Sequence, residues 1–89
     1  MKSWRIEITR TAEKQIRKLD RSAQEIILAF LHERLSGSHD PRQWGKALQG
    51  QKRGLWRYRV GNYRLICDIQ DERITVLVLE VGLRKDVYR

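Results

Sequence analysis

The chain has 89 residues, of which 40% are hydrophobic and 34% charged, and its formal net charge is +8. This length supports a single domain, residues 1–89, with one modest core, and the composition is too apolar for a disordered chain. The single cysteine, Cys67, excludes a disulfide framework, and no apolar run is long enough to cross a membrane. We therefore expect a soluble, cytoplasmic protein whose excess of basic residues favours an acidic partner, such as nucleic acid or an acidic protein.

The first part of the chain predicts one strand and two helices. Residues 3–8 alternate between apolar and polar side chains, which is typical of a half-buried strand. Thr9 stands where a helix N-cap belongs, and apolar residues recur at helical spacing over residues 10–19. A second helix is predicted to begin at Ser22, because Ser22 and Glu25 fit the capping-box pattern. The short link between the helices predicts an antiparallel helical hairpin.

A long connection, residues 36–54, follows the second helix, which is expected to end at Gly37. Trp44 and Leu48 are expected to anchor this connection to the body of the protein. The charge is uneven here, because residues 41–64 contain seven basic residues and no acidic one. A segment without acidic residues cannot form internal ion pairs, so it predicts a positive patch on one part of the surface.

A β-hairpin is predicted next. Two runs of β-forming residues flank Gly61-Asn62, and a two-residue loop that begins with glycine is typical of a type II′ turn. The loop fixes the register, so that Arg59 faces Arg64 across the strands, and side chains alternate between the two faces. The face predicted to be core consists of Trp56, Tyr58, Val60, Tyr63, Leu65, Cys67 and Ile69. The opposite face carries Arg57, Arg59 and Arg64.

The pairing of Arg59 with Arg64 has two interpretations. Like charges directly opposite each other destabilise a sheet, and a polyanion bound between them would remove that penalty. The alternative is a solvated basic face on which the long side chains point apart.

The last predicted strand, residues 73–81, is apolar on both faces, which is typical of a central strand. Glu80 is expected to share a face with Ile74, Val76 and Val78, and Val81 is expected on the other face. The order β-α-α-β-β-β predicts an α+β fold. In this fold the helical hairpin packs on one face of a mainly antiparallel four-stranded sheet, the first strand lies beside the last, and the second face of the sheet is uncovered.

Two segments resemble the RelE/ParE toxin superfamily, namely residues 54–65, GLWRYRVGNYRL, and residues 81–88, VGLRKDVY. The resemblance implies a small cytoplasmic toxin of a type II toxin–antitoxin system, with an acidic partner similar to the antitoxin RelB. In the RelE branch it implies a metal-independent endoribonuclease (an mRNA interferase) without a small-molecule cofactor. Such a toxin depends on the ribosome and cleaves mRNA in the A site by attack of the ribose 2′-hydroxyl on the phosphate.

Two other functions stay open at this point. The ParE branch implies a non-enzymatic inhibitor of DNA gyrase on the same fold. A plain RNA-binding module that cleaves nothing is the third possibility, because a fold alone does not determine function.

The resemblance also implies roles for single residues. Arg64 matches the family arginine that follows the hairpin turn and contacts the scissile phosphate. Arg84 matches the arginine of the C-terminal motif, and Tyr88 matches the tyrosine that follows it. Arg57 and Arg59 lie where some RelE toxins have lysines, and an arginine cannot lose its proton as a lysine can.

From these matches we predict two groups of site residues. The predicted catalytic residues are Arg59, Arg64, Arg84 and Tyr88, and the predicted RNA-binding residues are Arg57, Lys52 and Arg53. No metal ligand is predicted, because His32 and His39 lie far from any cluster of ligands. The three tryptophans, Trp4, Trp44 and Trp56, are expected to be core or anchor residues and not platforms for base stacking.

Overall fold

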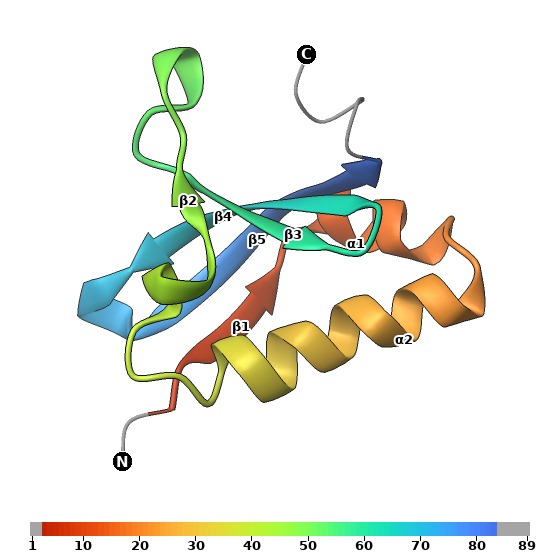
Figure 1. The fold of residues 1–89 in the computed structure, drawn as a ribbon, viewed down its shortest axis with the longest axis horizontal. Coiled ribbons are helices and arrows are strands. Elements are labelled where there is room, and N and C mark those ends of the chain that lie inside the picture. Colours follow the sequence, from red (N-terminus) through yellow and green to blue (C-terminus); the bar gives the residue numbers. More distant parts are fainter. Residues whose placement is uncertain (1–2, 84–89) are drawn as a thin grey trace.

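The computed structural model describes residues 3–83 of the chain. Two helices follow the first strand, and the remaining strands form the C-terminal half (Figure 1). The second helix continues from its α-helical part into a π-helical part, Phe30–Leu35. The elements are β1 (Arg5–Ile8), α1 (Arg10–Arg17), α2 (Arg21–Ala29), β2 (Lys46–Ala47), β3 (Trp56–Val60), β4 (Tyr63–Gln70) and β5 (Thr75–Leu83).

The sheet has the strand order β1-β5-β4-β3-β2. β1 runs parallel to β5, whereas the other neighbours are antiparallel. This arrangement confirms the predicted α+β class and the position of the first strand beside the last. The predicted number of four strands is wrong, because the two-residue strand β2 adds a fifth at the edge of β3. A strand this short leaves no alternating pattern in the sequence.

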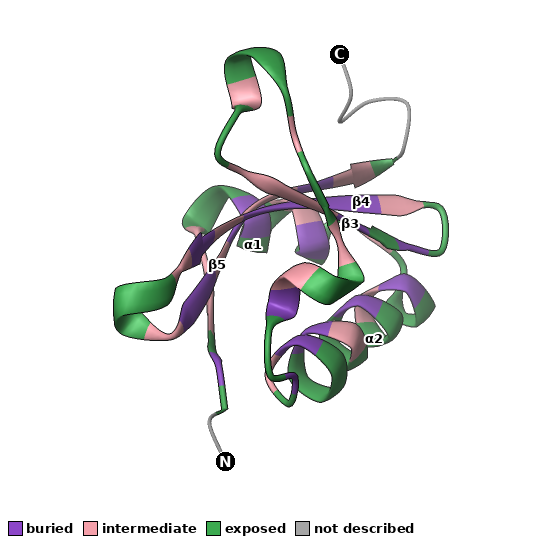
Figure 2. Cartoon of the chain, turned by 60° about the vertical axis from the view of Figure 1, so that its left-hand side comes forward, coloured by how far each residue is buried: buried purple, intermediate pink, exposed green. Residues whose placement is uncertain are grey.

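Both helices pack on one face of the sheet, where the core lies. Ala12 and Ile16 of α1 and Ile27 of α2 are buried against the core face of the strands. Figure 2 shows the buried residues along β4 and β5 and on the inner sides of the helices. In α1 the core thus uses the apolar residues that recur at helical spacing in the sequence.

The helix N-termini are capped by different kinds of residue. Thr9 caps α1 as predicted, because its Oγ1 accepts a hydrogen bond from the Ala12 N–H at 3.1 Å. The prediction for the second helix is wrong, because its N-cap is Asp20 and not Ser22. A side-chain oxygen of Asp20 accepts from the Ala23 N–H at 2.8 Å, and the helix therefore begins at Arg21. Aspartate and serine are equally good N-caps, so the sequence offered two nearby choices.

The hairpin of β3 and β4 has the predicted register, in which Arg59 pairs with Arg64 and Val60 with Tyr63. Gly61 has a φ of 58°, whereas Asn62 is not among the residues with positive φ. A positive φ at the first loop position alone is the geometry of a type II′ turn, so the predicted turn type is confirmed.

A β-bulge in β5 changes the predicted faces of the last strand. Ile66 pairs with Glu80 but Cys67 pairs with Val78, so Leu79 is an extra residue in β5. A bulge shifts the alternation by one residue. Val81 consequently belongs to the core, with 3% of its surface exposed, and Glu80 moves to the opposite face of the sheet. The sequence placed Glu80 on the face of Val76 and Val78 and Val81 on the other face, so both predictions are wrong.

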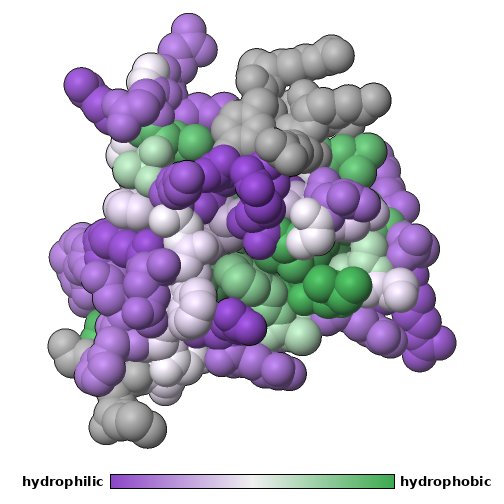
Figure 3. Space-filling view, in the orientation of Figure 1, coloured by the Kyte–Doolittle hydropathy of each residue, from purple (hydrophilic) through white to green (hydrophobic). Residues whose placement is uncertain are grey.

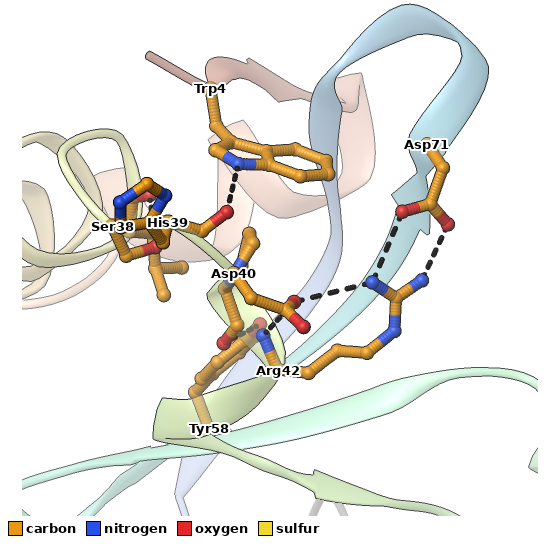
Figure 4. A network of polar contacts seen from close by, with 9 residues as sticks. Trp4, Ser38, His39, Asp40, Arg42, Tyr58 and Asp71 are labelled. Carbon is orange, nitrogen blue, oxygen red and sulfur yellow. Dashed lines mark hydrogen bonds and ion pairs between the residues drawn. The ribbon is translucent and has the colours of Figure 1, made fainter. Parts of the chain in front are cut away.

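The connection between the second helix and β3 is held by polar contacts (Figure 4). The Tyr58 hydroxyl donates to the Pro41 carbonyl at 2.9 Å, and Trp4 Nε1 donates to the His39 carbonyl at 3.3 Å. Leu48 is half-buried and donates its N–H to the Leu55 carbonyl at 3.0 Å, which extends the pairing of β2 with β3. Trp44 is not an anchor, because 42% of its surface is exposed.

The two candidate caps of the second helix can be separated by mutation. Asp20→Ala should lower the free energy of unfolding by about 1 kcal/mol, because it removes the acceptor of the Ala23 N–H. Ser22→Ala is the matched control and should cost less than about 0.5 kcal/mol, because Ser22 is exposed. Urea denaturation of both variants measures the difference. The assignment is wrong if Ser22→Ala is the more damaging change.

Candidate nucleic-acid interface

Basic side chains gather on the sheet face that lies opposite the helices. The pairing of Lys46 with Arg57 places these two residues on one face, because directly opposite residues point the same way. Arg59 follows two residues after Arg57 and shares that face. Arg59 is exposed and Arg57 is half-buried. The predicted row of cations therefore exists, and β2 adds Lys46 to it.

A groove lies among these cations. It has a volume of about 340 Å³ and is lined by Gln43, Trp44, Gly45, Lys46, Arg57 and Arg59. Three of these six side chains carry a positive charge, and Trp44 supplies an aromatic surface. This composition suits an anion that also has a flat apolar part.

A second hollow is different in character. It has a volume of about 250 Å³ and is lined by Ile26, Ala29, Phe30, Glu33, Arg34 and Val60. Figure 3 shows hydrophobic surface here, where α2 lies next to the β3–β4 hairpin. Its one acidic and one basic residue balance each other, so the groove of Lys46, Arg57 and Arg59 is the hollow that favours an anion.

Gly45 sets the distance between the groove wall and β3. A Cβ atom at this position would lie 2.6 Å from the Arg57 carbonyl oxygen and 2.8 Å from Cε1 of Tyr58. Such distances are far below van der Waals contact. Only glycine therefore lets the connection approach β3 closely enough for Lys46 to pair with Arg57.

Arg64 differs from the expectation of a solvent-facing arginine. It lies on the predicted face, opposite Arg59, yet only 1% of its surface is exposed. Among residues 3–83 it is the largest fully buried side chain. On its other side it pairs with Gly82, which has no side chain to compete for space. The expectation that this face is uncovered is therefore wrong at Arg64.

Burial changes what Arg64 can do. A guanidinium held away from water interacts more strongly with an anion than an exposed one does, because the local dielectric constant is lower. The same burial makes the residue part of the structure. Arg64 is therefore a structural residue, whereas the exposed Arg59 is not.

Arg42 directly precedes Gln43, the first residue of the groove lining, and is held by three contacts. Its guanidinium donates to Asp71 at 3.1 Å and to Asp40 at 3.3 Å, and its Cζ atom lies 5.8 Å from the ring centroid of Trp56. The hydrogen bond with Asp71 raises the pKa of Arg42 and lowers the pKa of Asp71. Because Asp40 lies in the connection and Asp71 follows β4, Arg42 links the connection to the β4–β5 turn.

Lys52 is also paired with an acid from outside the acid-free segment. Its Nζ lies 3.1 Å from Oε2 of Glu80, the residue that the bulge turns to this face. Lys52 and the exposed Arg53 do not line the groove. Their predicted role in RNA binding stays a prediction, as does that of Arg57. Arg84 and Tyr88 lie outside the described residues.

Other reactive groups are not placed for chemistry. Cys67 is fully buried on the core face, and burial raises the pKa of its thiol, so it is an inert core residue as expected. Residues 3–83 contain no group of three or more side chains that could hold a metal ion. None of the helices within this range has the length and apolar character needed to cross a membrane.

Comparison with known proteins identifies the family. Residues 6–88 match the family described as ParE toxin of type II toxin-antitoxin system, parDE. The chain belongs to the RelE/ParE toxin superfamily. Toxin RelG of Mycobacterium tuberculosis (strain ATCC 25618 / H37Rv) is 34% identical over 84 residues, which cover 94% of each chain. This match confirms the resemblance seen in the hairpin and the C-terminal motif.

Solved structures of RelE toxins agree with this fold. A chain of the toxin–antitoxin complex RelBE2 from Mycobacterium tuberculosis has a TM-score of 0.86 at 32% identity, and each chain is covered to 94%. The isolated E. coli RelE toxin has a TM-score of 0.71 at 26% identity, covering 97% of this chain and 92% of that one. These likenesses assign the chain to the RelE branch of the superfamily.

Sequence reasoning about this RelE-branch toxin predicted only Arg57 and Arg59 among the lining residues and missed the other four, which include Lys46 and Trp44. Lys46 was counted in the acid-free segment, but nothing local predicts that it pairs with Arg57. Trp44 was expected to be an anchor, because tryptophan is usually largely buried. Gly45 was a signal only for the close approach of the backbone to β3, and nothing local predicts that Trp44 is exposed.

The structural role of Arg64 can be tested on the free toxin. Arg64→Ala should lower the free energy of unfolding by roughly 2–5 kcal/mol, because it empties a buried site and leaves its surroundings adapted to a cation. Arg59→Ala is the matched control on the opposite strand and should change stability by less than about 0.5 kcal/mol. Thermal and urea unfolding measure both. Equal stability of the two variants would contradict the burial of Arg64.

The contact between Arg42 and Asp71 should weaken in acid. Because Arg42 lowers the pKa of Asp71 in the folded state, the contact contributes stability above the unfolded pKa of the carboxyl. That contribution is lost as the pH falls through the lowered folded pKa, below about pH 4. The difference in unfolding free energy between the parent and Asp71→Asn should therefore shrink in this range. At high salt the difference should be smaller from the start, so it should also change less with pH.

The control for this pH effect is the Arg42→Gln background. There the Asp71→Asn difference should be nearly independent of pH, because the cation that shifts the carboxyl is absent. Equal pH dependence in both backgrounds would mean that another group is responsible.

Proposed function

We propose that this toxin is a ribosome-dependent endoribonuclease that cleaves mRNA in the A site. The reaction is attack of the ribose 2′-hydroxyl on the adjacent phosphate, which releases the 5′-oxygen of the next nucleotide. The observation that supports this proposal is the groove of Lys46, Arg57 and Arg59, which lies beside the buried Arg64 on a RelE-branch fold. The endoribonuclease needs no metal in this scheme, because arginines supply the positive charge.

The chemistry requires three things: removal of the 2′-hydroxyl proton, stabilisation of the charge that develops on the phosphate, and protonation of the leaving oxygen. Arginine suits the second task, because its planar guanidinium matches the oxygens of a phosphate. Arg59 and Arg64 flank the same position from adjacent strands. In the proposal Arg59 contacts the scissile phosphate, and Arg57 contacts the RNA backbone beside it. Arg64 reaches the phosphate only after the groups that bury it in the free toxin have moved.

Four further residues belong to the proposed site, two because they match the family motif and two because they are basic. Arg84 and Tyr88 are assigned to catalysis by their match to the C-terminal motif, and Lys52 and Arg53 to RNA binding by their charge. Lys52 would have to exchange Glu80 for phosphate, since it is ion-paired with that carboxylate in the free toxin.

Dependence on the ribosome follows from the composition of the groove. Its lining contains no histidine or carboxylate, and its arginines cannot act as a general base, so Lys46 is the one lining residue of a type that can serve as a base. In the proposal, much of the rate comes from the alignment of the 2′-hydroxyl with the phosphate, which the ribosome provides by holding the message. Naked RNA at a similar concentration should accordingly be cleaved much more slowly.

The proposed partner is an acidic antitoxin similar to RelB. One of the matching structures is a chain of a toxin–antitoxin complex, RelBE2 from Mycobacterium tuberculosis. A toxin with a net charge of +8 attracts an acidic segment, and both proteins would act in the cytoplasm. We propose that this segment covers Arg57 and Arg59 or displaces the tail, residues 83–89. Arg64 cannot report on this binding by chemical labelling, because it is already buried in the free toxin.

Inhibition of DNA gyrase is the second candidate function, and the description of the matched family favours it. A gyrase inhibitor needs a protein-binding surface but no set of cations around a phosphate. The two candidate functions therefore differ in the role of Arg59, which binds a phosphate in the nuclease and has no such role in a gyrase inhibitor. A supercoiling assay with purified gyrase, run beside the cleavage assay, separates them.

The test of the nuclease proposal is single-turnover cleavage of ribosome-bound message. Arg59→Ala should cleave roughly 10²–10³-fold more slowly, because one donor to the developing negative charge is lost. Arg5→Ala is the matched control, because Arg5 is exposed on the same sheet face in β1, at the far edge from the groove. It should cleave within about 3-fold of the parent, since loss of one distant surface charge acts only through screened attraction.

Three results would count against the proposal. These are no cleavage by the parent on programmed ribosomes, an Arg59→Ala rate close to that of the parent, and inhibition of gyrase by the parent at the concentrations used for cleavage. The choice of Arg59 avoids the ambiguity of Arg64, whose loss would also change stability.

A further inference from the structure

Trp44 is an exposed aromatic side chain in the lining of the groove. Its exposed fraction is 42%, whereas Trp4 is buried at 7%. An indole on the surface costs free energy, because a large apolar area is left in contact with water. Trp44 lines the groove together with Lys46, Arg57 and Arg59, so the exposed ring borders the proposed phosphate site.

Arg34 holds the indole in place. It lies in the π-helical end of the second helix, and its Cζ atom is 4.8 Å from the ring centroid of Trp44. A cation over the ring attracts its electron-rich face, and this contact restricts rotation of the side chain. Because Arg34 lies over one face of the ring, a second planar group can stack only on the opposite face. With 42% of its surface exposed, Trp44 has apolar area open to such a ligand.

The groove combines the two features that single-stranded RNA needs from a protein. Cations bind the phosphates, and an aromatic ring stacks on a base without regard to its sequence. Its volume of about 340 Å³ is near the lower end of ligand pockets, which hold roughly 300–1,000 Å³. That size suits one nucleotide. Gln43, next to Trp44 in the lining, adds an amide that can donate to or accept from a base edge.

We propose that Trp44 is a stacking platform for one nucleobase of the bound message. The base lies against the face of the indole that Arg34 leaves open, and its phosphate lies toward Lys46, Arg57 and Arg59. This inference rests on the proposed ribonuclease function and adds a binding residue to it. Trp44 touches a base next to the cleavage site and has no part in proton transfer.

The test is a double-mutant cycle between Trp44 and single bases of the message. Ribosomes are programmed with messages whose A-site codon is 2′-O-methylated, so that the toxin binds without cleaving. Three further messages each lack one base of this codon. Loss of the stacked base should weaken binding of the parent toxin roughly 5- to 100-fold. Trp44→Leu should bind that message and the intact one equally well.

Two further variants make the cycle specific. Trp44→Phe should recover much of the affinity for the intact message, because a smaller ring still stacks. Arg59→Ala should weaken binding to all four messages by a similar factor, because a phosphate contact does not depend on the base. All three Trp44 proteins should unfold at similar temperatures, because the residue is exposed.

The possible failures are distinguishable. If the parent cleaves the unmethylated message but no missing base couples to Trp44, the stacking inference is wrong and the nuclease proposal stands. If Trp44→Leu loses affinity for the antitoxin and none for the message, Trp44 belongs to a protein interface instead. If the parent neither binds nor cleaves message on the ribosome, both proposals fail.

Discussion

The turn at Gly61-Asn62 decides on which side of the sheet each side chain of β3 and β4 lies. The positive φ of Gly61 closes the loop with two residues and sets Arg59 opposite Arg64. A slip of one residue would turn Tyr58 and Leu65 to the outer face and the arginines into the core. The separation of core from cationic surface therefore depends on one glycine and on the burial that favours this register.

Two cations of the acid-free segment are paired with acids that lie far away in sequence. Arg42 is tied to Asp71 after β4, and Lys52 to Glu80 of β5. Arg42 and Lys52 do not line the groove, whereas Lys46, Arg57 and Arg59 do. Acids supplied by the tertiary fold thus neutralise two cations outside the lining, and the cations of the lining supply its positive potential.

Features set by neighbouring residues could be predicted from the sequence, and features set by distant contacts could not. The hairpin register follows from a two-residue loop, and the cap at Thr9 follows from the residues beside it. The bulge at Leu79, the pairing of Lys46 with Arg57 and the burial of Arg64 depend on chain segments that lie far apart in sequence. The row of arginines on one sheet face was therefore predicted. The burial of Arg64 and the position of Trp44 in the groove lining were not.

The part of the groove wall formed by β2 lies outside the core, so its residues can vary among such toxins more freely than core residues. β2 has two residues, both exposed, and it pairs with only the first two residues of β3. Substitutions in this short edge strand and in the turn before it disturb little buried surface, provided that Gly45 is kept. The shape and charge of the groove can thus change at positions 43, 44, 46 and 47 at low cost in stability, while Arg57, Arg59 and Arg64 stay fixed by the pairing of β3 with β4.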